Sequence, residues 1–303
     1  MKDSSHTSTL GTATESATLL SPAAITAAIN DAMVAKALKP RGTTFLLAIM
    51  AGAFIALGFI FYTSSQMGSS EFAWYGLTKT VGGLTFSVGL ILVIFTGADL
   101  FTSATMTLVP LFRRHITVRE WAIHWLVVYI GNFVGALALA AIIFFSATYE
   151  QGHGQWGVVV LQVVSGKVTH SWIEAFLLGI MANLCVCLAV FMATGAKSGV
   201  HKMLAVIGPI ALFVASGFEH SVANMFLIPL GILIGGHGSD AFWASAAVAQ
   251  AGVTPDITAT INTSSFLINN LIPVTLGNII GGGVLVGLAY SFIYLRSSEK
   301  PAA

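Results

Sequence analysis

The stretch Gly97-Ala98-Asp99-Leu100-Phe101-Thr102-Ser103 places a glycine and an acid inside a long apolar run, and Gly217-Phe218-Glu219-His220-Ser221 repeats this arrangement later in the chain. Each stretch ends one apolar segment. Each is followed by a shorter apolar piece that ends near a proline, Pro110 or Pro229. Glycine is a poor helix former, and an acid is costly in an apolar setting. The pattern therefore predicts two helices that break partway along their length.

The chain around these breaks has the composition of an integral membrane protein. Its 303 residues include 13 Lys+Arg and 12 Asp+Glu, so charged residues make up 8% of the chain, against about 25% in a soluble domain. Hydrophobic residues reach 56%, and the mean hydropathy is +0.86. The net charge of +1 and the lack of basic runs argue against nucleic-acid binding. We expect an all-α polytopic membrane protein.

The order of segments suggests three regions. Residues 1–20 are rich in Ser, Thr and Ala and are expected to form a disordered tail. Residues 21–40 begin with a capping serine and a proline, and their apolar residues recur at helical spacing, which predicts a short amphipathic helix on the cytoplasmic side. Residues 41–303 are expected to form a single domain with six membrane spans.

Six apolar segments are predicted to cross the membrane: Thr43–Tyr62, Val81–Thr96, Trp121–Ser146, Trp172–Ala193, Met203–Phe218 and Leu271–Tyr294. The second and fifth are short for a hydrocarbon layer of about 30 Å. These are the two segments that end at the breaks.

A second repeated sequence pattern, besides the two breaks, links the two halves of the chain. Gly131-Asn132 with Gly135 in the third segment is repeated by Gly277-Asn278 with Gly281 in the sixth. Repeats of about 43–146 and 172–295 with three spans each must be inserted in opposite directions. Paired interrupted helices of this kind indicate a transport site near the midplane. The alternative is that these Gly and Asn residues only allow close helix packing.

Charge bias gives the orientation. With both termini in the cytoplasm, every Lys and Arg except Lys79 and Lys167 falls on the cytoplasmic side.

Ionisable residues within apolar segments are the first candidates for function. They are Asp99, Glu174, Glu219, His124 and His220. Capping the resumed helices is the simpler role for Asp99 and Glu219, and His220 could be a satisfied core histidine. Glu174 and His124 lie near span ends, which favours interfacial or packing roles. A second reading is that the breaks, with their positive helix ends, form a path for a small anion or its neutral acid.

Four runs, FSVGLILVIFTGADLFTS, VVYIGNFVGALALA, FVASGFEHSVANMF and NNLIPVTLGNIIGGG, resemble the formate/nitrite transporter family. The resemblance extends from the first span to the C-terminus. It implies an aquaporin-like homopentamer in the inner membrane, with a separate pore in each protomer. Formate and related small anions would be the substrates, with no cofactor, metal or enzymatic activity.

The resemblance also assigns pore residues. It implies an outer constriction of Phe86 and Phe213 and an inner one of Leu90, Leu100 and Phe101. Between them lie His220, which would assist protonation, and Thr102 of a mobile gating loop. The polar partners would be Asn224 in the pore, Asn183 near the vestibule and Lys167 at the outer mouth.

Other functions remain open at this point. Nitrite, hydrosulfide, acetate or lactate could replace formate, since the pore-lining residue types barely distinguish them. A water or glycerol channel would share inverted repeats, but neither break has an Asn-Pro-Ala sequence. We find no nucleophile–base pair, metal cluster or nucleotide loop that would indicate an enzyme.

Overall fold

A computed structural model describes residues 19–69, 74–254 and 258–295. The predicted tail lies outside the described residues up to position 18. Leu19 pairs with Ala196, and the N–H of Leu20 donates to the carbonyl of Gly195 at 3.0 Å, so the end of that segment is tied to the body of the protein. Arg296 and Lys300, which were counted for orientation, also lie outside the described residues.

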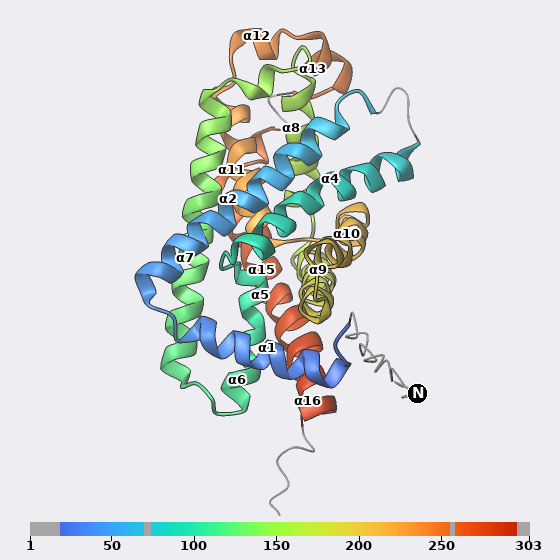
Figure 1. Cartoon of the computed structure of the whole chain (residues 1–303). Helices are drawn as coiled ribbons and strands as arrows, with labels where there is room; N and C mark the ends of the chain where they lie inside the picture. The colour runs from blue at the N-terminus through green and yellow to red at the C-terminus, as the bar shows by residue number, and fades with distance from the viewer. Residues whose placement is uncertain (1–18, 70–73, 255–257, 296–303) are drawn as a thin grey trace, which may run out of the picture.

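The described residues form helices joined by short turns (Figure 1). In chain order these are α1 (Pro22–Ala37), α2 (Arg41–Gln66), α4 (Tyr75–Thr96), α5 (Phe101–Ala104), η1 (Thr105–Thr107), α6 (Leu108–Phe112), α7 (Val118–Phe145), η2 (Thr148–Glu150), α8 (Gln155–Val168), α9 (Trp172–Gly195), α10 (Gly199–Ala215), α11 (Ser221–His237), α12 (Asp240–Trp243), α13 (Ala246–Ala251), η3 (Ser265–Leu271), α15 (Ile272–Asn278), η4 (Ile279–Leu288) and α16 (Ala289–Leu295).

Within the described part of the chain, five helical segments are long and apolar enough to cross a membrane. They are α2, α4, α7, α9 and the continuous run Ser265–Leu295. In that last run, α15 and α16 alternate with η3 and η4, which are wider π-helical turns. Shorter apolar helices are Phe101–Phe112, α10 and α11.

The structure corrects the expected length of the second span. Helix α4 begins at Tyr75 rather than Val81 and has 22 residues, which is enough to span a bilayer before the break. The polar residues Thr78 and Lys79 concealed this first turn. The fifth segment, α10, is short at 17 residues. Helix α8, which lines the candidate site, was not among the segments predicted from the sequence.

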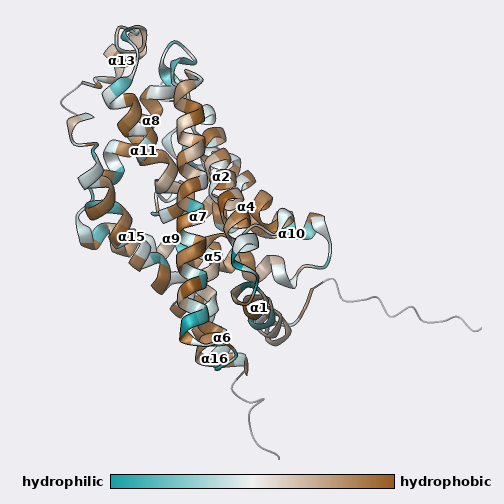
Figure 2. Cartoon of the chain, turned by 90° about the vertical axis from the view of Figure 1, so that its left-hand side faces the viewer, coloured by the Kyte–Doolittle hydropathy of each residue, from teal (hydrophilic) through white to brown (hydrophobic). Residues whose placement is uncertain are grey.

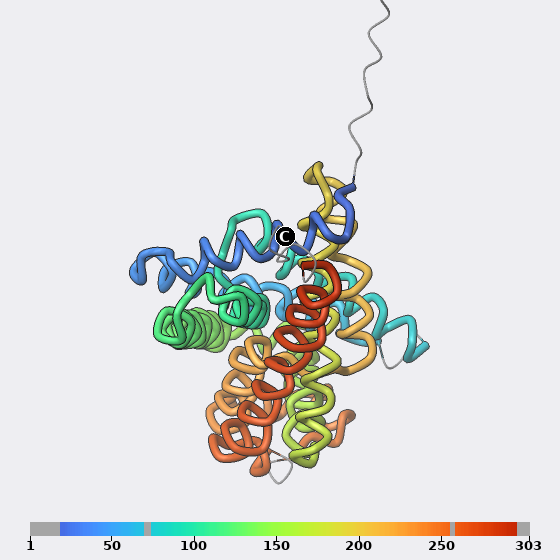
Figure 3. Tube along the Cα trace, turned by 90° about the horizontal axis from the view of Figure 1, so that it is seen from below, coloured from blue at the N-terminus to red at the C-terminus, as the bar shows by residue number. Residues whose placement is uncertain are grey.

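The helices form one elongated bundle. Figure 1 shows α8, α12 and α13 at one end, and α1, α6 and α16 at the other. Figure 2 shows hydrophobic residues along most of α7, with hydrophilic ones gathered at its lower end. Seen from below in Figure 3, α1 crosses this end beside the C-terminal helix.

Helix α1 packs onto the bundle. Ser21 caps it by accepting a hydrogen bond from the N–H of Ala24 at 3.3 Å. Ile25, Ile29 and Met33 share one face and are buried in a cluster with Phe191 of α9, Val286 of η4, Met106 and Cys187. The helix is therefore held by packing within the protein.

The repeated glycines allow close helix packing in both halves. A Cβ at Gly135 would collide with the carbonyl oxygen of Ile49, and one at Gly281 with that of Ile180. These contacts bring α7 against α2, and η4 against α9, at nearly backbone distance.

Candidate functional site

The two predicted breaks are present and have the same backbone geometry. Gly97 has a φ of +70° and Gly217 a φ of +72°, a left-handed conformation that glycine adopts without strain. The N–H of Ala98 donates to the carbonyl of Val93, and that of Phe218 to the carbonyl of Phe213, each at 3.1 Å. These bonds close the ends of α4 and α10.

One buried amide side chain holds the first break. Oδ1 of Asn132 accepts from the N–H of Phe101 at 2.8 Å, at the start of α5. Its Nδ2 donates to the carbonyl oxygens of Ala48 at 2.8 Å and Asp99 at 2.9 Å. The backbone groups freed by the break are thereby satisfied inside the protein.

Asn278 does the same at the second break. Its Oδ1 accepts from the N–H of Ser221 at 2.9 Å. Its Nδ2 donates to the carbonyl oxygens of Gly179 at 2.8 Å and Glu219 at 2.9 Å. The repeated Gly-Asn pattern therefore serves two purposes, since the glycines allow close packing and the asparagines brace the breaks.

The expectation that Asp99 and Glu219 cap the resumed helices is wrong. The side chain of Asp99 is 1% exposed and pairs with Lys36 at 2.9 Å and Lys39 at 2.7 Å. Leu100 occupies the N-cap of α5 and provides no side-chain hydrogen bond. The amide of Asn132 satisfies the first N–H instead, which leaves the acid free to pair with lysines.

Glu219 is the centre of a polar network at the second break. Its Oε1 lies 2.8 Å from Nζ of Lys167 and 3.9 Å from Nε2 of His170. Its Oε2 accepts from Nδ2 of Asn224 at 2.7 Å and from Nδ2 of Asn270 at 3.2 Å. The carboxylate, 1% exposed, is therefore surrounded by donors.

His220 lies beside this network at the N-cap of α11. Its Nδ1 accepts from the N–H of Ala223 at 3.1 Å, and its Nε2 lies 2.9 Å from Oγ1 of Thr102. Because Nδ1 accepts, the neutral ring carries its proton on Nε2, and that N–H donates to the hydroxyl oxygen of Thr102. The structure thus joins the two breaks through one hydrogen bond.

Aromatic side chains stack around His220. The ring of Phe213 lies 5.9 Å from that of His220 and 5.5 Å from that of Phe86, which it meets edge-on. Phe59 extends the group, with its ring 5.3 Å from Phe86. The residues predicted for the outer constriction, Phe86 and Phe213, therefore form a continuous aromatic contact next to the histidine.

The residues expected at the inner constriction are also buried. Leu90 is 1% exposed, Leu100 0% and Phe101 3%. The ring of Phe101 packs against Tyr129 and Trp125 of α7, at 4.8 and 5.6 Å. Leu100 and Phe101, which directly precede Thr102 in the chain, are therefore both buried apolar residues.

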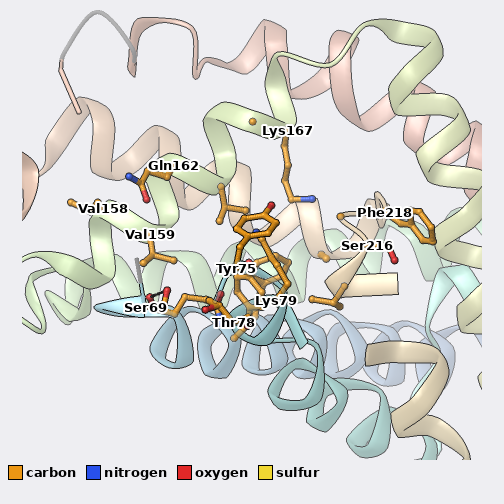
Figure 4. Close-up of a pocket in the computed structure, with 18 of the residues that line it drawn as sticks. Ser69, Tyr75, Thr78, Lys79, Val158, Val159, Gln162, Lys167, Ser216 and Phe218 are labelled. Carbon is orange, nitrogen blue, oxygen red and sulfur yellow. Dashed lines mark hydrogen bonds between the residues drawn. The ribbon is translucent and has the colours of Figure 1, made fainter. Parts of the chain in front are cut away.

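A cavity of about 1190 Å³ leads from the outer surface to His220. Figure 4 shows Gln162 and Lys167 of α8 on one side of it and Tyr75, Thr78 and Lys79 on the other. Phe213, Phe218, Glu219 and His220 also line it. Lys167, which was expected near the outer mouth of a pore, lines this cavity, and its ammonium group is paired with Glu219.

The family resemblance placed Asn183 in the vestibule region. It is fully buried and does not line the cavity. Its Nδ2 donates to the carbonyl oxygens of Thr102 at 3.0 Å and Asn278 at 2.6 Å, and to Oγ1 of Thr105 at 3.2 Å. Since these are mostly backbone acceptors, Asn183 fixes α5 against the sixth span. Asn224 is likewise buried and away from the cavity lining.

The partners of the two acids were not expected from the sequence. Lys36 and Lys39 were counted only for orientation, and Asn270 and His170 were not singled out. The two acids could have indicated that such partners exist, because a buried carboxylate requires a cation or several hydrogen-bond donors.

A family model described as formate/nitrite transporter matches residues 23–292 of the chain. The formate channel FocA of Escherichia coli (strain K12) is 47% identical over 281 residues, which cover 93% of this chain and 96% of that protein. The formate channel FocA of Haemophilus influenzae is 45% identical over 278 residues, covering 92% and 96%.

Solved structures show the same similarity. A structure titled "Pentameric formate channel with formate bound" superposes with a TM-score of 0.78 at 43% identity, covering 84% of this chain and 98% of that one. An "FNT family ion channel" superposes with a TM-score of 0.69 at 28% identity, covering 90% and 98%.

Proposed function

Because this multi-pass membrane protein belongs to the formate/nitrite transporter family, and so to a family of transporters rather than enzymes, we propose that it is a channel for formate and related small monovalent anions. Its substrate would enter through the outer cavity, pass His220 and Thr102 between the two apolar constrictions, and leave at the cytoplasmic side. The curated relatives named as formate channels and the bound formate in the related structure support formate as the first substrate to test.

The observation that carries the proposal is the position of His220. It lines the outer cavity, donates to Thr102, and is flanked by Phe213. A polar, proton-carrying group between apolar side chains is suited to a substrate that alternates between an anion and a neutral acid.

Electrostatics explains why the acid form would cross. Moving a carboxylate into a medium of low dielectric costs on the order of 20 kcal/mol in the idealised limit, so the apolar constrictions oppose the anion. An anion reaching His220 would take the Nε2–H bond from Thr102. A hydronium ion in the cavity then gives its proton to the formate held by His220, which yields neutral formic acid and water and leaves the ring neutral.

The architecture we propose is six spans, the second and fifth broken, in two inverted repeats with both termini in the cytoplasm. The support is the matched bracing by Asn132 and Asn278 and the equal geometry at Gly97 and Gly217. In the related structure the channel is pentameric. We propose the same assembly here, in the inner membrane, with one pore in each protomer.

We also propose a gate at Gly97–Ser103. Lys36 and Lys39, at and just after the end of α1, hold Asp99 within this loop. Nδ2 of Asn30, on α1, lies 3.2 Å from Nδ1 of His115, in the turn before α7. Movement of α1 with pH would therefore reach the loop that carries Thr102.

Formate uptake into proteoliposomes tests the proposed function. Purified protein should carry labelled formate faster than empty vesicles, and faster at acid pH. No flux above empty vesicles would exclude a formate channel. Competition by nitrite, hydrosulfide, acetate and lactate in the same assay ranks the substrates, and a stopped-flow osmotic assay measures water flux.

A further inference from the structure

A second cavity, of about 250 Å³, lies at the opposite end of the protein from the outer cavity. It sits between the turn that joins α1 to α2 and the first turns of α7. The polar residues that line it are Lys39, Arg41, Thr44, Arg119, Glu120 and His124. The proposed path through His220 and Thr102 uses none of these side chains.

The charge of this cavity is strongly positive. Arg41 makes no hydrogen bond or ion pair with any residue in the described part of the chain. Lys39 is shared with Asp99. Glu120 is the one acid in the lining, and its Oε2 already accepts from the N–H and hydroxyl of Thr117 at 2.7 and 2.8 Å. The free cationic groups therefore outnumber the free acceptors.

The backbone adds to this positive potential. Helix α2, 26 residues long, begins at Arg41, and Pro40 at its N-cap supplies no side-chain acceptor for the first-turn N–H groups. Helix α7 begins beside it at Val118. The uncapped start of α2 therefore directs its positive end toward the cavity, whereas a capping box of Thr117 and Glu120 already closes the start of α7.

His124 is the independent sign of a missing ligand. The residue is only 4% exposed and lines the cavity. Neither Nδ1 nor Nε2 has a hydrogen-bond partner in the described part of the chain. A buried ring with both nitrogens unpaired is destabilising, so the cavity lacks at least one group that can bond to it. The packing role expected for His124 from the sequence does not account for this.

We propose that this inner cavity binds a phosphate group. A phosphate has enough oxygens to accept from two guanidinium groups, the N–H groups of α2 and the imidazole of His124 together. Arginine matches phosphate in geometry and can donate two parallel bonds. A formate ion, with two oxygens, would leave most of these donors unused.

Two sources could supply the phosphate. One is free inorganic phosphate. The other is a phospholipid headgroup, since basic cavities between helices on the cytoplasmic side recognise anionic headgroups. Leu46 of α2 and Leu126 of α7, each two residues along the chain from the lining residues Thr44 and His124, are 65% and 60% exposed and offer an apolar surface for an acyl chain.

Full-length protein reconstituted in nanodiscs tests the proposal. Calorimetric titration with inorganic phosphate in phosphatidylcholine nanodiscs gives the affinity. Arg41→Gln should weaken binding roughly tenfold or more, the loss expected for one charged hydrogen bond. His124→Gln should weaken it as well. Lys202→Gln removes a charge elsewhere on the same proposed face and should leave the affinity unchanged.

Cryo-electron microscopy of the same samples distinguishes the sources. Density in the cavity in phosphatidylcholine with added phosphate identifies free phosphate. Density that appears only in phosphatidylglycerol nanodiscs identifies a lipid headgroup as the ligand. In that case the density should be absent from the Arg41→Gln variant. An empty cavity in both lipids would overturn the proposal, as would an Arg41→Gln variant with parental phosphate affinity and unchanged lipid density. Formate flux is not needed for either result.

Discussion

The amide of Asn132 makes the same three hydrogen bonds at the first helix break as the amide of Asn278 makes at the second. Each accepts from the first N–H of the resumed helix. Each donates to a carbonyl within its break and to another on a neighbouring span. Neither side chain is exposed. In both halves, an asparagine therefore pairs the backbone groups that a helix break at membrane depth would otherwise leave without partners.

Replacing either asparagine by leucine should destabilise the protein to a similar degree. Each variant leaves one N–H and two carbonyl groups without their side-chain partner, and each unsatisfied group costs about 1–3 kcal/mol. We expect lower thermal unfolding midpoints for Asn132→Leu and Asn278→Leu in detergent. Each variant serves as the control for the other. A large loss for one and none for the other would contradict the equivalence of the two braces.

The Lys167–Glu219 pair should be needed for stability as a pair. Removing one partner of a buried pair costs about 3–5 kcal/mol. Lys167 is 12% exposed, so we expect the lower end of that range. Lys167→Met and Glu219→Gln should each lower the unfolding midpoint, whereas the double variant should recover part of the loss. Strictly additive losses would show that the two side chains act independently.

The breaks could be predicted from sequence because their signal is local. A glycine followed two residues later by an acid interrupts an otherwise apolar run, and the structure has Gly97 and Gly217 at those points. The function of the acids could not be predicted in the same way. Asp99 and Glu219 are paired by lysines 60 and 52 residues away, so only the folded chain reveals that they are not caps.

The candidate pore residues were assigned from family resemblance rather than from a local sequence pattern. Nothing in the sequence places Thr102 beside His220, which lies 118 residues later in the chain. The same holds for Asn183, whose side chain donates to the carbonyl oxygen of Thr102, 81 residues earlier in the chain. Helix α8 was missed because its apolar residues are interrupted by Gln162 and Lys167, the residues that face the outer cavity.

His220→Asn should impair formate transport while the protein still folds and assembles. Asparagine can still accept from the N–H of Ala223 and cap α11, but it lacks the Nε2–H group beside which formate is proposed to be protonated. We expect an assembled protein with strongly reduced formate flux and a flatter dependence on pH. Size-exclusion chromatography checks assembly, and proteoliposome uptake from pH 5 to 8 checks transport. Parental flux at every pH would remove His220 from the mechanism.

Phe213→Ala should loosen selectivity while transport continues. The ring of Phe213 contacts both Phe86 and His220, so its loss opens the apolar contact next to the histidine. A wider, less apolar constriction admits water and larger anions. We expect a higher ratio of lactate to formate uptake, with Phe86→Ala acting in the same direction. Phe213→Leu, which keeps an apolar side chain, is the control. An unchanged ratio in the alanine variants would argue against an outer constriction at this position.

The N-terminal helix should control the pH dependence of flux through Asp99. Lys36 and Lys39 hold this carboxylate in the loop that leads to Thr102. Deleting the residues before Thr43 removes both lysines together with the packing of α1. We expect the truncated protein to assemble and to conduct formate with an altered pH–flux curve.

A second variant separates the ion pair from the packing of α1. In Lys36→Gln with Lys39→Gln, the helix keeps its buried face of Ile25, Ile29 and Met33, while Asp99 loses its partners. If the pairs transmit the signal, this double variant should reproduce the altered curve, and adding Asp99→Asn should relieve the unpaired charge. A truncated pentamer with the full parental curve would eliminate the N-terminal gate and leave the assignment of His220 and Phe213 intact.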